Sequence, residues 1–510
     1  MGHYAKQLNK ALLPLDSRAI ITHIIERFPA NAEFVIGVGY QQDQVRQYLG
    51  IAHPDRVIIY VEVDNYEGPG SGPGYSLSCC QSLLQQPFYF VSCDTLWDNE
   101  LPSPANYNWL GVAPVPATET ERYCNLRVDG GRVRELRDKE RVNDKSFHAF
   151  VGLCYIHDHA IFWQALGSEV TIAGERQVSN GIRALISACE VKPFSVTWTD
   201  VGDFEKYKKA VLQFADFDFS KSDEFFYSVR GKIIKYFVDT NITDRRVAKA
   251  SLNPDVFPPI TDHVGGFYAY PYQPGETLYQ YNSVDILQAL LNWLETAVWK
   301  TVVVNEADMR RACRQFYQEK TLKRLEAYDR KYPAENQPMV INGQPVPPLQ
   351  ELLPQIPWAE LERGVPRFIH GDLQFDNILY DKATASFKLL DWRQDFAGEV
   401  AFGDLYYDFA KLRGGIILNY DYIKRNLLGY AEEGGRAFFD FAQRYQTSTY
   451  LKILDQHVAK CGLDVDKVRL LVACIYLNMA PLHHYPFDKM LHALGRILLA
   501  EELERRKCVS

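Results

Sequence analysis

The sequence lacks the features that mark several special classes of protein. It holds 10 cysteines, but none stand in the C-x-x-C spacing of a zinc site or a redox motif. No long block of like charges occurs, and the longest apolar stretch, near residues 468–477, is well short of a bilayer span. Residues 1–10 contain no apolar segment of a secretion signal. The sequence therefore predicts a cytoplasmic protein without membrane insertion.

A large excess of either charge is also missing. The chain has 56 Lys+Arg against 64 Asp+Glu, a formal net charge of -8, which argues against nucleic acid as a main partner. What the chain does have is length. Its 510 residues are 47% hydrophobic, enough to bury sizeable cores in about two to four domains. Composition leaves the oligomeric state open.

Residues 11–213 alternate short β-branched or aromatic runs with helical patterns. The runs at 34–38, 57–63 and 88–92 are typical of strands, and helical segments separate them. Strands alternating with helices predict an α/β domain with a mostly parallel sheet and helices on both faces. We expect this domain to span residues 1–215.

A different pattern begins near Phe225. Two short strands surround a polar turn at residues 230–232, and another apolar pair flanks Gly265 and Gly266, so a small antiparallel sheet is expected. After Thr277 the apolar residues follow helical spacing. The sequence therefore predicts an α+β domain over 216–510, with a small lobe at about 222–277 and a helical lobe at about 278–510.

The strongest chemical signal lies in the helical part. The segment H-G-D-L-Q-F-D-N begins at His370, and an apolar strand, a turn and a second strand lead from it to L-L-D-W, which contains Asp391. Phosphoryl transfer needs a carboxylate to orient the attacking hydroxyl and oxygen ligands to hold Mg²⁺ on the phosphates. Asp372, Asn377 and Asp391 supply these groups. A hairpin between them would bring Asn377 and Asp391 together at one end.

These residues resemble the catalytic loop and metal-binding aspartate of the aminoglycoside phosphotransferase and choline kinase-like family. The resemblance implies a bilobal protein-kinase-like fold, ATP as phosphoryl donor, Mg²⁺ and a small-molecule hydroxyl as acceptor. By this likeness Asp372 is the catalytic base, His370 the structural histidine of the loop, and Asn377 and Asp391 the magnesium ligands. Residues 403–408 resemble the G-D-x-x-x-D segment that follows in many members.

The same resemblance assigns the nucleotide-phosphate contact to Lys235, on the second strand of the small sheet. Two departures accompany it. No glycine-rich loop precedes this lysine beyond Gly231, and the following helix lacks the glutamate that usually pairs with it, a role for which Asp244 is a substitute. Trp392 and Tyr485 could bind a choline-type cation, although core packing is the better account of these aromatic residues.

The first domain carries a second set of charged residues. Lys10 begins the element K-A-L-L-P, Asp94 follows the strand at 88–92, and Asp200 follows the strand at 194–196. Nucleotidyl transfer joins a phosphomonoester to the α-phosphate of an NTP, so its site needs a metal held by carboxylates and cations for the phosphates. Asp94 and Asp200 are placed to share one Mg²⁺ at the carboxyl end of a sheet.

This arrangement resembles the sugar-phosphate and phosphocholine nucleotidyltransferase family, which implies a Rossmann-like fold and CTP or another NTP as substrate. By that likeness Lys10 is the lysine of the K-x-L-L-P element, Asp94 and Asp200 are metal ligands, and Lys139 contacts the acceptor phosphate. Residues 68–75 resemble the loop that lines the nucleotide base, with a flexible turn as the alternative.

The departure in this domain is the absence of the family's first apolar strand and glycine-rich phosphate loop. The chain begins at Met1-Gly2, which matches only the end of that loop. Either the given start lacks upstream residues, or the domain has lost nucleotidyl transfer and serves as a scaffold.

Together the two halves predict a bifunctional transferase. A kinase would phosphorylate an amino alcohol or sugar, and a nucleotidyltransferase would convert the product to an NDP- or CDP-activated head group for a surface polysaccharide or lipid. Two alternatives stay open: a kinase with a degenerate N-terminal scaffold, and a non-catalytic nucleotide-binding protein.

Overall fold

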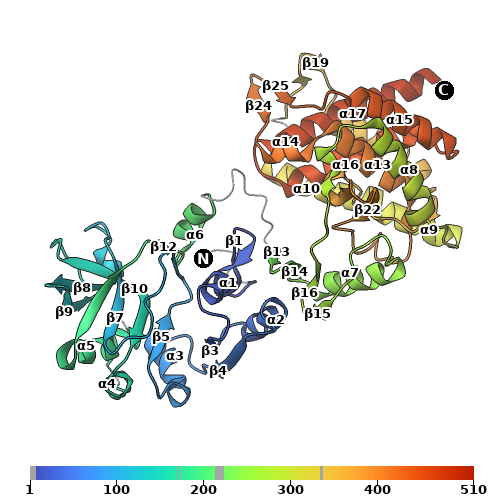
Figure 1. Cartoon of the computed structure of the whole chain (residues 1–510). Coiled ribbons are helices and arrows are strands. Elements are labelled where there is room, and N and C mark those ends of the chain that lie inside the picture. The colour runs from blue at the N-terminus through green and yellow to red at the C-terminus, as the bar shows by residue number, and fades with distance from the viewer. Residues whose placement is uncertain (1–6, 169, 173, 213–222, 334–336, 510) are drawn as a thin grey trace. The chain divides into compact units, whose positions relative to one another are not determined.

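The computed structural model describes residues 7–168, 170–172, 174–212, 223–333 and 337–509. It divides the chain into two compact units (Figure 1). Unit 1 comprises Met1–Val238 and Val264–Ala269, and unit 2 comprises Asp239–His263 and Tyr270–Ser510. The expected domain boundary at 215 lies outside the described residues. Strands and helices mix in both units, which confirms the expected combination of α/β and α+β folds.

The main sheet of unit 1 has six strands in the order β11-β7-β10-β8-β9, with β5 also pairing β10. The strands are β5 (Phe88–Val91), β7 (Asn108–Ala113), β8 (Cys124–Asp129), β9 (Arg132–Asp138), β10 (Phe147–Ile156) and β11 (Val191–Ser195). Helices α4 (His159–Leu166) and α5 (Ser179–Ala188) supply the buried Phe162, Ile182 and Leu185 to its core.

The expectation of a mostly parallel sheet is wrong for these strands. Only β7 and β11 pair in parallel, whereas β5, β7 and β8 pair β10 antiparallel and β8 pairs β9 antiparallel. The β8–β9 connection turns at Gly130 and Gly131, whose φ angles of 55° and 73° suit glycine. A tight turn of this kind joins antiparallel neighbours, because a parallel pair needs a long crossover.

A separate parallel pair lies nearer the N-terminus. Strands β3 (Glu33–Val38) and β4 (Val57–Glu62) are joined by α2 (Gln42–Ala52), the helical crossover that the sequence predicts. Among the described strands, neither pairs with the six-stranded sheet. The same region includes the hairpin β1 (Pro14–Leu15) and β2 (Arg18–Ala19) and the helices α1 (Ile20–Glu26) and α3 (Pro73–Cys79).

The expected small antiparallel sheet is present, in the order β13-β14-β16-β15. Its strands are β13 (Glu224–Val229), β14 (Lys232–Phe237), β15 (Asp262–Val264) and β16 (Phe267–Pro271). Its apolar side chains share one core with the N-terminal helices of unit 1. The Tyr227 hydroxyl donates to the Leu12 carbonyl at 2.7 Å, and its ring centroid lies 4.8 Å from that of Tyr48. Most of the sheet that the kinase resemblance assigns to a small lobe therefore belongs to unit 1, whereas residues 262–263 of β15 and 270–271 of β16 belong to unit 2.

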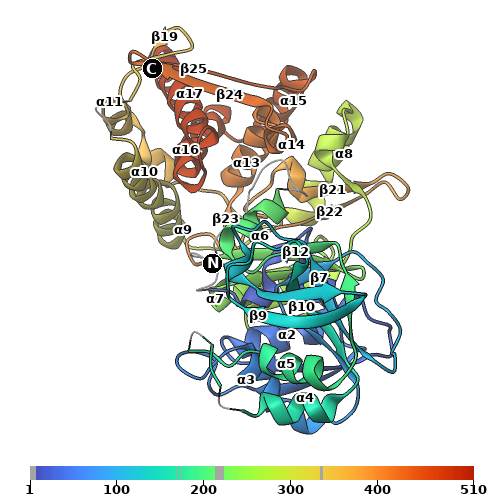
Figure 2. The same cartoon turned by 90° about the vertical axis from the view of Figure 1, so that its left-hand side faces the viewer.

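Unit 2 is mostly helical. Its central helices are α13 (Leu405–Ile417), α16 (Val465–Met479) and α17 (Phe487–Val509), and most residues of α13 and α16 are buried. Figure 2 shows α16 and α17 running side by side. The other helices of unit 2 include α7 (Thr240–Leu252), α8 (Val284–Trp293), α14 (Tyr420–Lys424) and α15 (Thr447–Lys460), of which α15 packs against α13 and α16.

One long helical stretch of unit 2 changes type within its length. Helices α9 (Glu306–Cys313) and α10 (Lys320–Lys331) are joined without a break by a π-helical segment, η7 (Arg314–Glu319). The sheets of unit 2 are small: β17 (Glu276–Thr277) with the hairpin β21 (Ile378–Asp381) and β22 (Ser386–Leu389), β20 (Pro366–Arg367) with β23 (Gly403–Asp404), and β18 (Val340–Ile341) and β19 (Gln344–Pro345) with β24 (Leu428–Glu433) and β25 (Arg436–Phe441).

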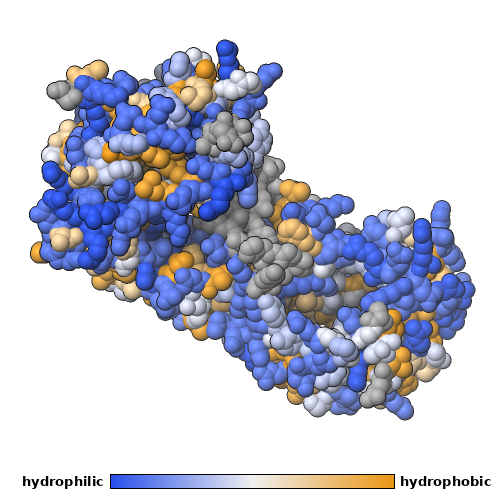
Figure 3. Space-filling model, turned by 180° about the vertical axis from the view of Figure 1, so that it is seen from behind, coloured by the Kyte–Doolittle hydropathy of each residue, from blue (hydrophilic) through white to orange (hydrophobic). Residues whose placement is uncertain are grey.

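The outer surface agrees with the charged composition. In the view of Figure 3 the hydrophobic residues form small, separated patches on a largely hydrophilic face. Among the described helices, none combines the length and the apolar character that crossing a bilayer would require.

Two candidate active sites

The segment after β20 holds His370 in a fixed orientation in unit 2. The side chain is fully buried, and its Nδ1 accepts a hydrogen bond from the Asp372 N–H at 3.1 Å. Its Nε2 therefore carries the proton and donates to the Leu390 carbonyl at 2.8 Å. Burial lowers the pKa of His370 to about 4, so the ring is neutral near pH 7. His370 thus ties the loop of Asp372 to the end of the β21–β22 hairpin.

A second buried side chain holds the same loop. Asp408 on α13 accepts from the His370 N–H at 2.8 Å and the Gly371 N–H at 2.7 Å, and the Trp299 indole donates to it at 3.0 Å. Asp404, at the start of the helix, accepts from the Val365 N–H at 2.8 Å. Burial raises the pKa of both carboxyls, and the N–H donors oppose that shift. Within the G-D-x-x-x-D segment, Asp408 therefore positions the loop, and Asp404 holds the backbone that precedes β20.

Asp372 forms an ion pair that the sequence analysis missed. Its Oδ1 lies 2.7 Å from the Lys411 Nζ, with the lysine side chain 6% exposed and the aspartate side chain 35% exposed. Burial opposes ionisation of Asp372, but the charge and hydrogen bond of Lys411 outweigh it and lower the pKa of the carboxyl to about 2. Lys411 lies three residues after Asp408 among the mostly apolar residues of α13, a placement that could have drawn attention to it.

Asn377 and Asp391 lie at one end of the expected hairpin. Ile378 pairs with Leu389 in the register of β21 and β22, and the Leu390 N–H donates to the Asn377 carbonyl at 2.8 Å. The Asn377 Nδ2 donates to the Asp372 carbonyl at 2.8 Å, so its Oδ1 is the atom suited to a cation. Asp391 has a φ of 53°, an uncommon backbone conformation that often marks functional sites. An amide oxygen and a carboxylate fit the oxygen ligands that Mg²⁺ prefers.

Helix α7 lacks the glutamate that the kinase resemblance leads one to expect, and it carries a buried lysine. Lys249 is 2% exposed, and its Nζ donates to the carbonyls of Arg393 at 2.8 Å and His370 at 3.3 Å. Burial lowers its pKa to about 7. Asp244, the suggested substitute, instead lies 3.0 Å from the His263 Nε2. Lys235, on β14 in unit 1, is 4% exposed.

Trp392 belongs to the core of unit 2. Its side chain is fully buried, and its indole N–H donates to the Arg246 carbonyl at 2.8 Å. Tyr485, in contrast, is 59% exposed and is not part of this core. Core packing, rather than a cage for a choline-type cation, therefore describes Trp392.

Unit 1 brings Asp94 and Asp200 together. Asp94 directly precedes β6 (Thr95–Trp97), Asp200 ends β12 (Trp198–Asp200), and these two strands pair antiparallel with Asp200 opposite Thr95. Gly202 lies between the two carboxylates: a Cβ at this glycine would be 2.9 Å from the Asp200 Oδ1 and 3.2 Å from the Asp94 Oδ2. Two carboxylates this close can share a divalent cation.

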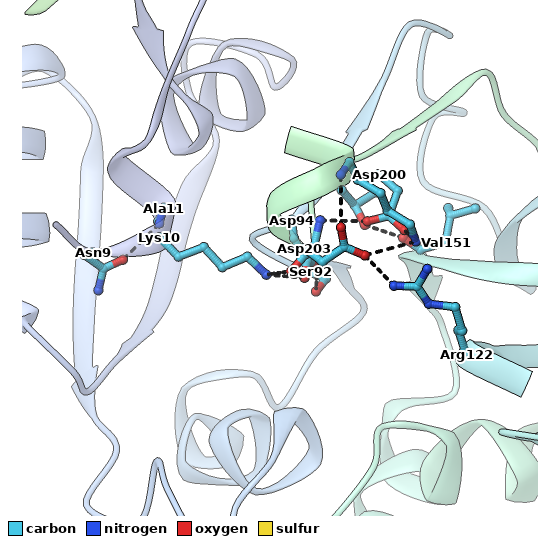
Figure 4. Close-up of polar contacts among 12 residues, drawn as sticks. Asn9, Lys10, Ala11, Ser92, Asp94, Arg122, Val151, Asp200 and Asp203 are labelled. Carbon is cyan, nitrogen blue, oxygen red and sulfur yellow. Dashed lines mark hydrogen bonds and ion pairs between the residues drawn. The ribbon is translucent and has the colours of Figure 1, made fainter. Parts of the chain in front are cut away.

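Each of these aspartates is paired with its own lysine. The Lys10 Nζ lies 2.7 Å from the Asp94 Oδ2, and Figure 4 shows the lysine side chain reaching to Asp94. Lys206, on α6 (Phe204–Val211), forms an ion pair with Asp200, to which the Tyr123 hydroxyl also donates at 2.8 Å. Burial opposes ionisation of Asp94, and Lys10 outweighs it, so the pKa of this carboxyl is lowered. The sequence predicts Lys10 as a site residue, whereas no motif in it points to Lys206.

The other two N-terminal predictions fall elsewhere. The exposed Lys139 lies 3.6 Å from Glu175, and the structure gives it no contact with Asp94 or Asp200. In the glycine-containing loop, Gly72 has a φ of 117°, and a Cβ there would lie 2.7 Å from the Arg176 carbonyl. The loop therefore needs glycine to pack closely on neighbouring backbone.

The C-terminal geometry agrees with a comparison of the sequence with family models. Residues 245–446 match the phosphotransferase enzyme family (APH). This match includes His370, Asp372, Asn377, Asp391 and Lys411. It confirms the expected phosphotransferase-like C-terminal part and, with it, a transferase.

Solved structures give a weaker likeness. A UDP-glucose pyrophosphorylase in complex with UDP-glucose is 17% identical, with a TM-score of 0.36, and the match covers 42% of this chain and 95% of that one. A putative glucose-1-phosphate thymidylyltransferase from Bacillus anthracis is 17% identical, with a TM-score of 0.37, and the match covers 44% of this chain and 93% of that one. HddC from Yersinia pseudotuberculosis is 15% identical, with a TM-score of 0.31, and the match covers 41% of this chain and 91% of that one.

The names of these structures agree with the nucleotidyltransferase resemblance, and at such TM-scores they carry no further argument. No curated protein matches this chain.

Proposed function

We propose that unit 2 transfers the γ-phosphoryl group of ATP to a hydroxyl of a small molecule. The observation that carries this proposal is the fixed loop of Asp372, next to Asn377 and the end of the hairpin that leads to Asp391. The pKa of about 2 keeps the Asp372 carboxylate ionised at neutral pH, so it can accept a hydrogen bond from the acceptor hydroxyl. His370 and Asp408 hold the backbone of the loop and position that carboxylate.

The reaction follows from these roles. The acceptor oxygen forms a bond to the γ-phosphorus while the bond from that phosphorus to the β-γ bridging oxygen breaks, ADP leaves, and the hydroxyl proton passes to Asp372. Asn377 and Asp391 would hold Mg²⁺, which neutralises phosphate charge when bound. The nucleotide contact expected for Lys235 stays a prediction.

The test is an acceptor screen with the full chain. Purified protein is incubated with ATP, Mg²⁺ and a panel of sugars, polyols and amino alcohols, and phosphorylated products are detected by mass spectrometry. Asp372→Asn should lower turnover by about a thousandfold, because it removes the group that accepts the proton. The matched control is Asp440→Asn at an exposed position on β25. Equal loss in both variants, or unchanged turnover in Asp372→Asn, contradicts the proposal.

For unit 1 we propose nucleotidyl transfer to the phosphorylated product, with Asp94 and Asp200 as the groups that would hold Mg²⁺. The product would be an NDP- or CDP-activated head group for a surface polysaccharide or lipid. The two carboxylates converge at Gly202, which supports this function, and Lys10 and Lys206 are cations suited to phosphate.

The ion pairs at the same place favour a second candidate, a kinase whose N-terminal unit is a scaffold. Lys10 and Lys206 neutralise both aspartates, so a metal must displace them. To decide between the transferase and the scaffold, pyrophosphate release is measured with each NTP in the presence of the phosphorylated product of unit 2. Release that Asp94→Asn abolishes and the exposed Asp129→Asn leaves intact supports the transferase. No release with any NTP supports the scaffold.

A further inference from the structure

Cationic side chains gather beside Asp372 in unit 2. Lys320 and Arg324 lie one helical turn apart on α10, immediately after the π-helical segment η7, and π-helical segments often occur at functional sites. The other two members lie after Asp391 and on α13. We call this group the cationic cluster: Lys320, Arg324, Arg393 and Lys411. Among the described residues, Asp372 is the only carboxylate within 4.0 Å of any member, and its ion pair is with Lys411.

One set of contacts runs from the catalytic loop to α10. The Arg393 side chain covers the glycine that precedes Asp372, since a Cβ on Gly371 would lie 2.8 Å from the Arg393 Cβ. The Arg393 guanidinium carbon is 5.0 Å from the ring centroid of Phe316, and the Lys320 Nζ is 3.9 Å from the same centroid. Arg393 and Lys320 therefore contact one aromatic ring next to the catalytic loop.

A second set of contacts connects the remaining members at the end of α16. Arg324 donates to the side chain of Asn478 and, at 3.3 Å, to its carbonyl. The Lys411 Nζ lies 3.8 Å from the Met479 Sδ, the next residue along the chain, and 2.7 Å from Asp372. The cluster is thus connected to Asp372 by two separate routes.

Such an arrangement costs stability. Burial lowers the pKa of Lys320 well below its ordinary value, and the positive charges of Arg393, Arg324 and Lys411 lower it further. Burial and Arg393 lower the pKa of Arg324 to about 10. The Nε of Arg393 is buried and has no hydrogen-bond partner in the described part of the chain. Lys320, Arg324 and Arg393 are half-buried, and cations partly withdrawn from water without counter-ions are unfavourable unless a ligand supplies the negative charge.

Phosphoryl transfer by itself does not require this many cations. Lys411, at 2.7 Å from Asp372, can face the transferred phosphoryl group. Lys320 and Arg324 are additional, and their charge would repel a choline-type or other cationic acceptor. An acceptor with a carboxylate or phosphate group would instead form charge-assisted hydrogen bonds with them.

We propose that the acceptor of unit 2 is itself an anion, a small polyol or sugar with a carboxylate or phosphate group in addition to the hydroxyl that is phosphorylated. Lys320, Arg324 and Arg393 bind the anionic group, and Asp372 receives the hydroxyl. This inference rests on the phosphotransferase function proposed above and narrows its acceptor from amino alcohols and neutral sugars to anionic ones.

The experiment compares acceptors that differ in charge and share a shape: glucose, glucuronate and glucose 6-phosphate, extended to the corresponding forms of other sugars and polyols. In the wild type, kcat/KM should be at least about tenfold higher for an anionic form than for its neutral partner. Lys320→Met with Arg324→Met should raise KM for the anionic form roughly tenfold to a hundredfold, and raise it more for the anionic form than for the neutral form, so that the preference is lost. Lys320→Arg should retain the preference.

The matched control is Lys323→Met, which removes a positive charge from an exposed position of the same helix. It should leave the preference unchanged. A neutral form that is phosphorylated as well as or better than its anionic partner overturns this inference and leaves the phosphotransferase function standing. Equal loss for both forms in the double variant also overturns it, because the cations would then serve ATP.

A binding measurement covers the case in which no compound is phosphorylated. Isothermal titration of the full chain with glucuronate and glucose 6-phosphate, without ATP, should give binding at millimolar concentration that the double variant loses. That result supports the anion site even if the phosphotransferase proposal fails. Absence of binding by every anionic compound of the panel overturns the inference. Thermal unfolding of the double variant should show a Tm no lower than wild type, which a purely structural role would not allow.

Discussion

The two candidate sites differ in how their aspartates are neutralised. In unit 1, Asp94 and Asp200 each have a lysine partner, so the charges balance one to one. In unit 2, Asp372 has Lys411 as its ion-pair partner while further cations lie close by, and Asp408 is held by N–H groups that carry no charge. In unit 1, a metal ion can bind the aspartates only if it displaces their lysine partners. In unit 2, the surplus positive charge favours binding of an anionic ligand.

The largest effect is expected from a change at Asp408, which holds the catalytic loop through hydrogen bonds from uncharged N–H groups. Asp408→Asn replaces a fully buried carboxylate that accepts from His370, Gly371 and Trp299 with an amide that has one acceptor oxygen. We expect a loss of about 3 kcal/mol in the free energy of unfolding, together with lower turnover, measured by urea unfolding and steady-state kinetics. If the variant is as stable and as active as wild type, the hydrogen bonds of Asp408 do not hold the catalytic loop in place.

The pH dependence of stability tests the buried lysine behind this loop. Burial lowers the pKa of Lys249 to about 7, below its usual 10.5, so the unfolded chain binds more protons between these values. The contribution of this group to stability therefore rises from pH 7 to about 10.5, and its full penalty is present below pH 7. Urea unfolding as a function of pH should show this slope in the wild type and a smaller slope in Lys249→Met.

A neutral buried lysine would still donate to the carbonyls of His370 and Arg393, so the folded loop does not depend on its charge. The same slope in wild type and Lys249→Met would assign the pH dependence to other groups. Lys300→Met offers a comparison, because Lys300 is an exposed lysine of the same unit whose Nζ donates to the Asn253 side chain at 2.8 Å.

Removal of one lysine sharpens the comparison for unit 1. Lys10→Met leaves Asp94 without its counter-ion, so a divalent cation no longer competes with an ammonium group. Titration with Mn²⁺ should show about tenfold tighter binding than in wild type, while stability without metal falls by about 1 kcal/mol. Unchanged Mn²⁺ affinity would mean that Lys10 and the metal do not compete. The exposed Lys145→Met serves as the control.

The smallest effect concerns the small sheet. Tyr227→Phe removes the hydrogen bond to the Leu12 carbonyl within the shared core of unit 1. We expect a loss of about 1 kcal/mol in the free energy of unfolding of unit 1, with turnover unchanged. Chemical denaturation monitored by hydrogen exchange would show which unit loses stability. A loss confined to unit 2 would contradict the assignment of this sheet to the core of unit 1.

The proximity of the candidate site residues of unit 2 could be predicted from the sequence because these residues are close along the chain. Asp372, Asn377 and Asp391 lie within about twenty residues, and the strand pattern and turn between Asn377 and Asp391 fix a hairpin that brings its ends together. Asp94 and Asp200 were also found from the strands beside them, since a strand end limits where the next residue can lie. In each case a short-range pattern constrains the position of a functional side chain.

What the sequence missed depends on distant segments. Lys411 and Lys206 are ordinary helix residues until the fold places them against Asp372 and Asp200. The antiparallel pairing around β10 also depends on which strand lies next to which, and alternation of strands and helices does not contain that information.

By itself the sequence determined which oxygen and nitrogen groups are available, where the strands and helices form, and that a phosphotransferase-like loop surrounds Asp372. Only the tertiary structure decided which lysine faces which aspartate, that the small sheet shares the core of unit 1, and that four cations meet beside one carboxylate. The physical reason is range: motifs and periodicity act over a few residues, whereas burial and charge act between side chains that only the folded chain brings together.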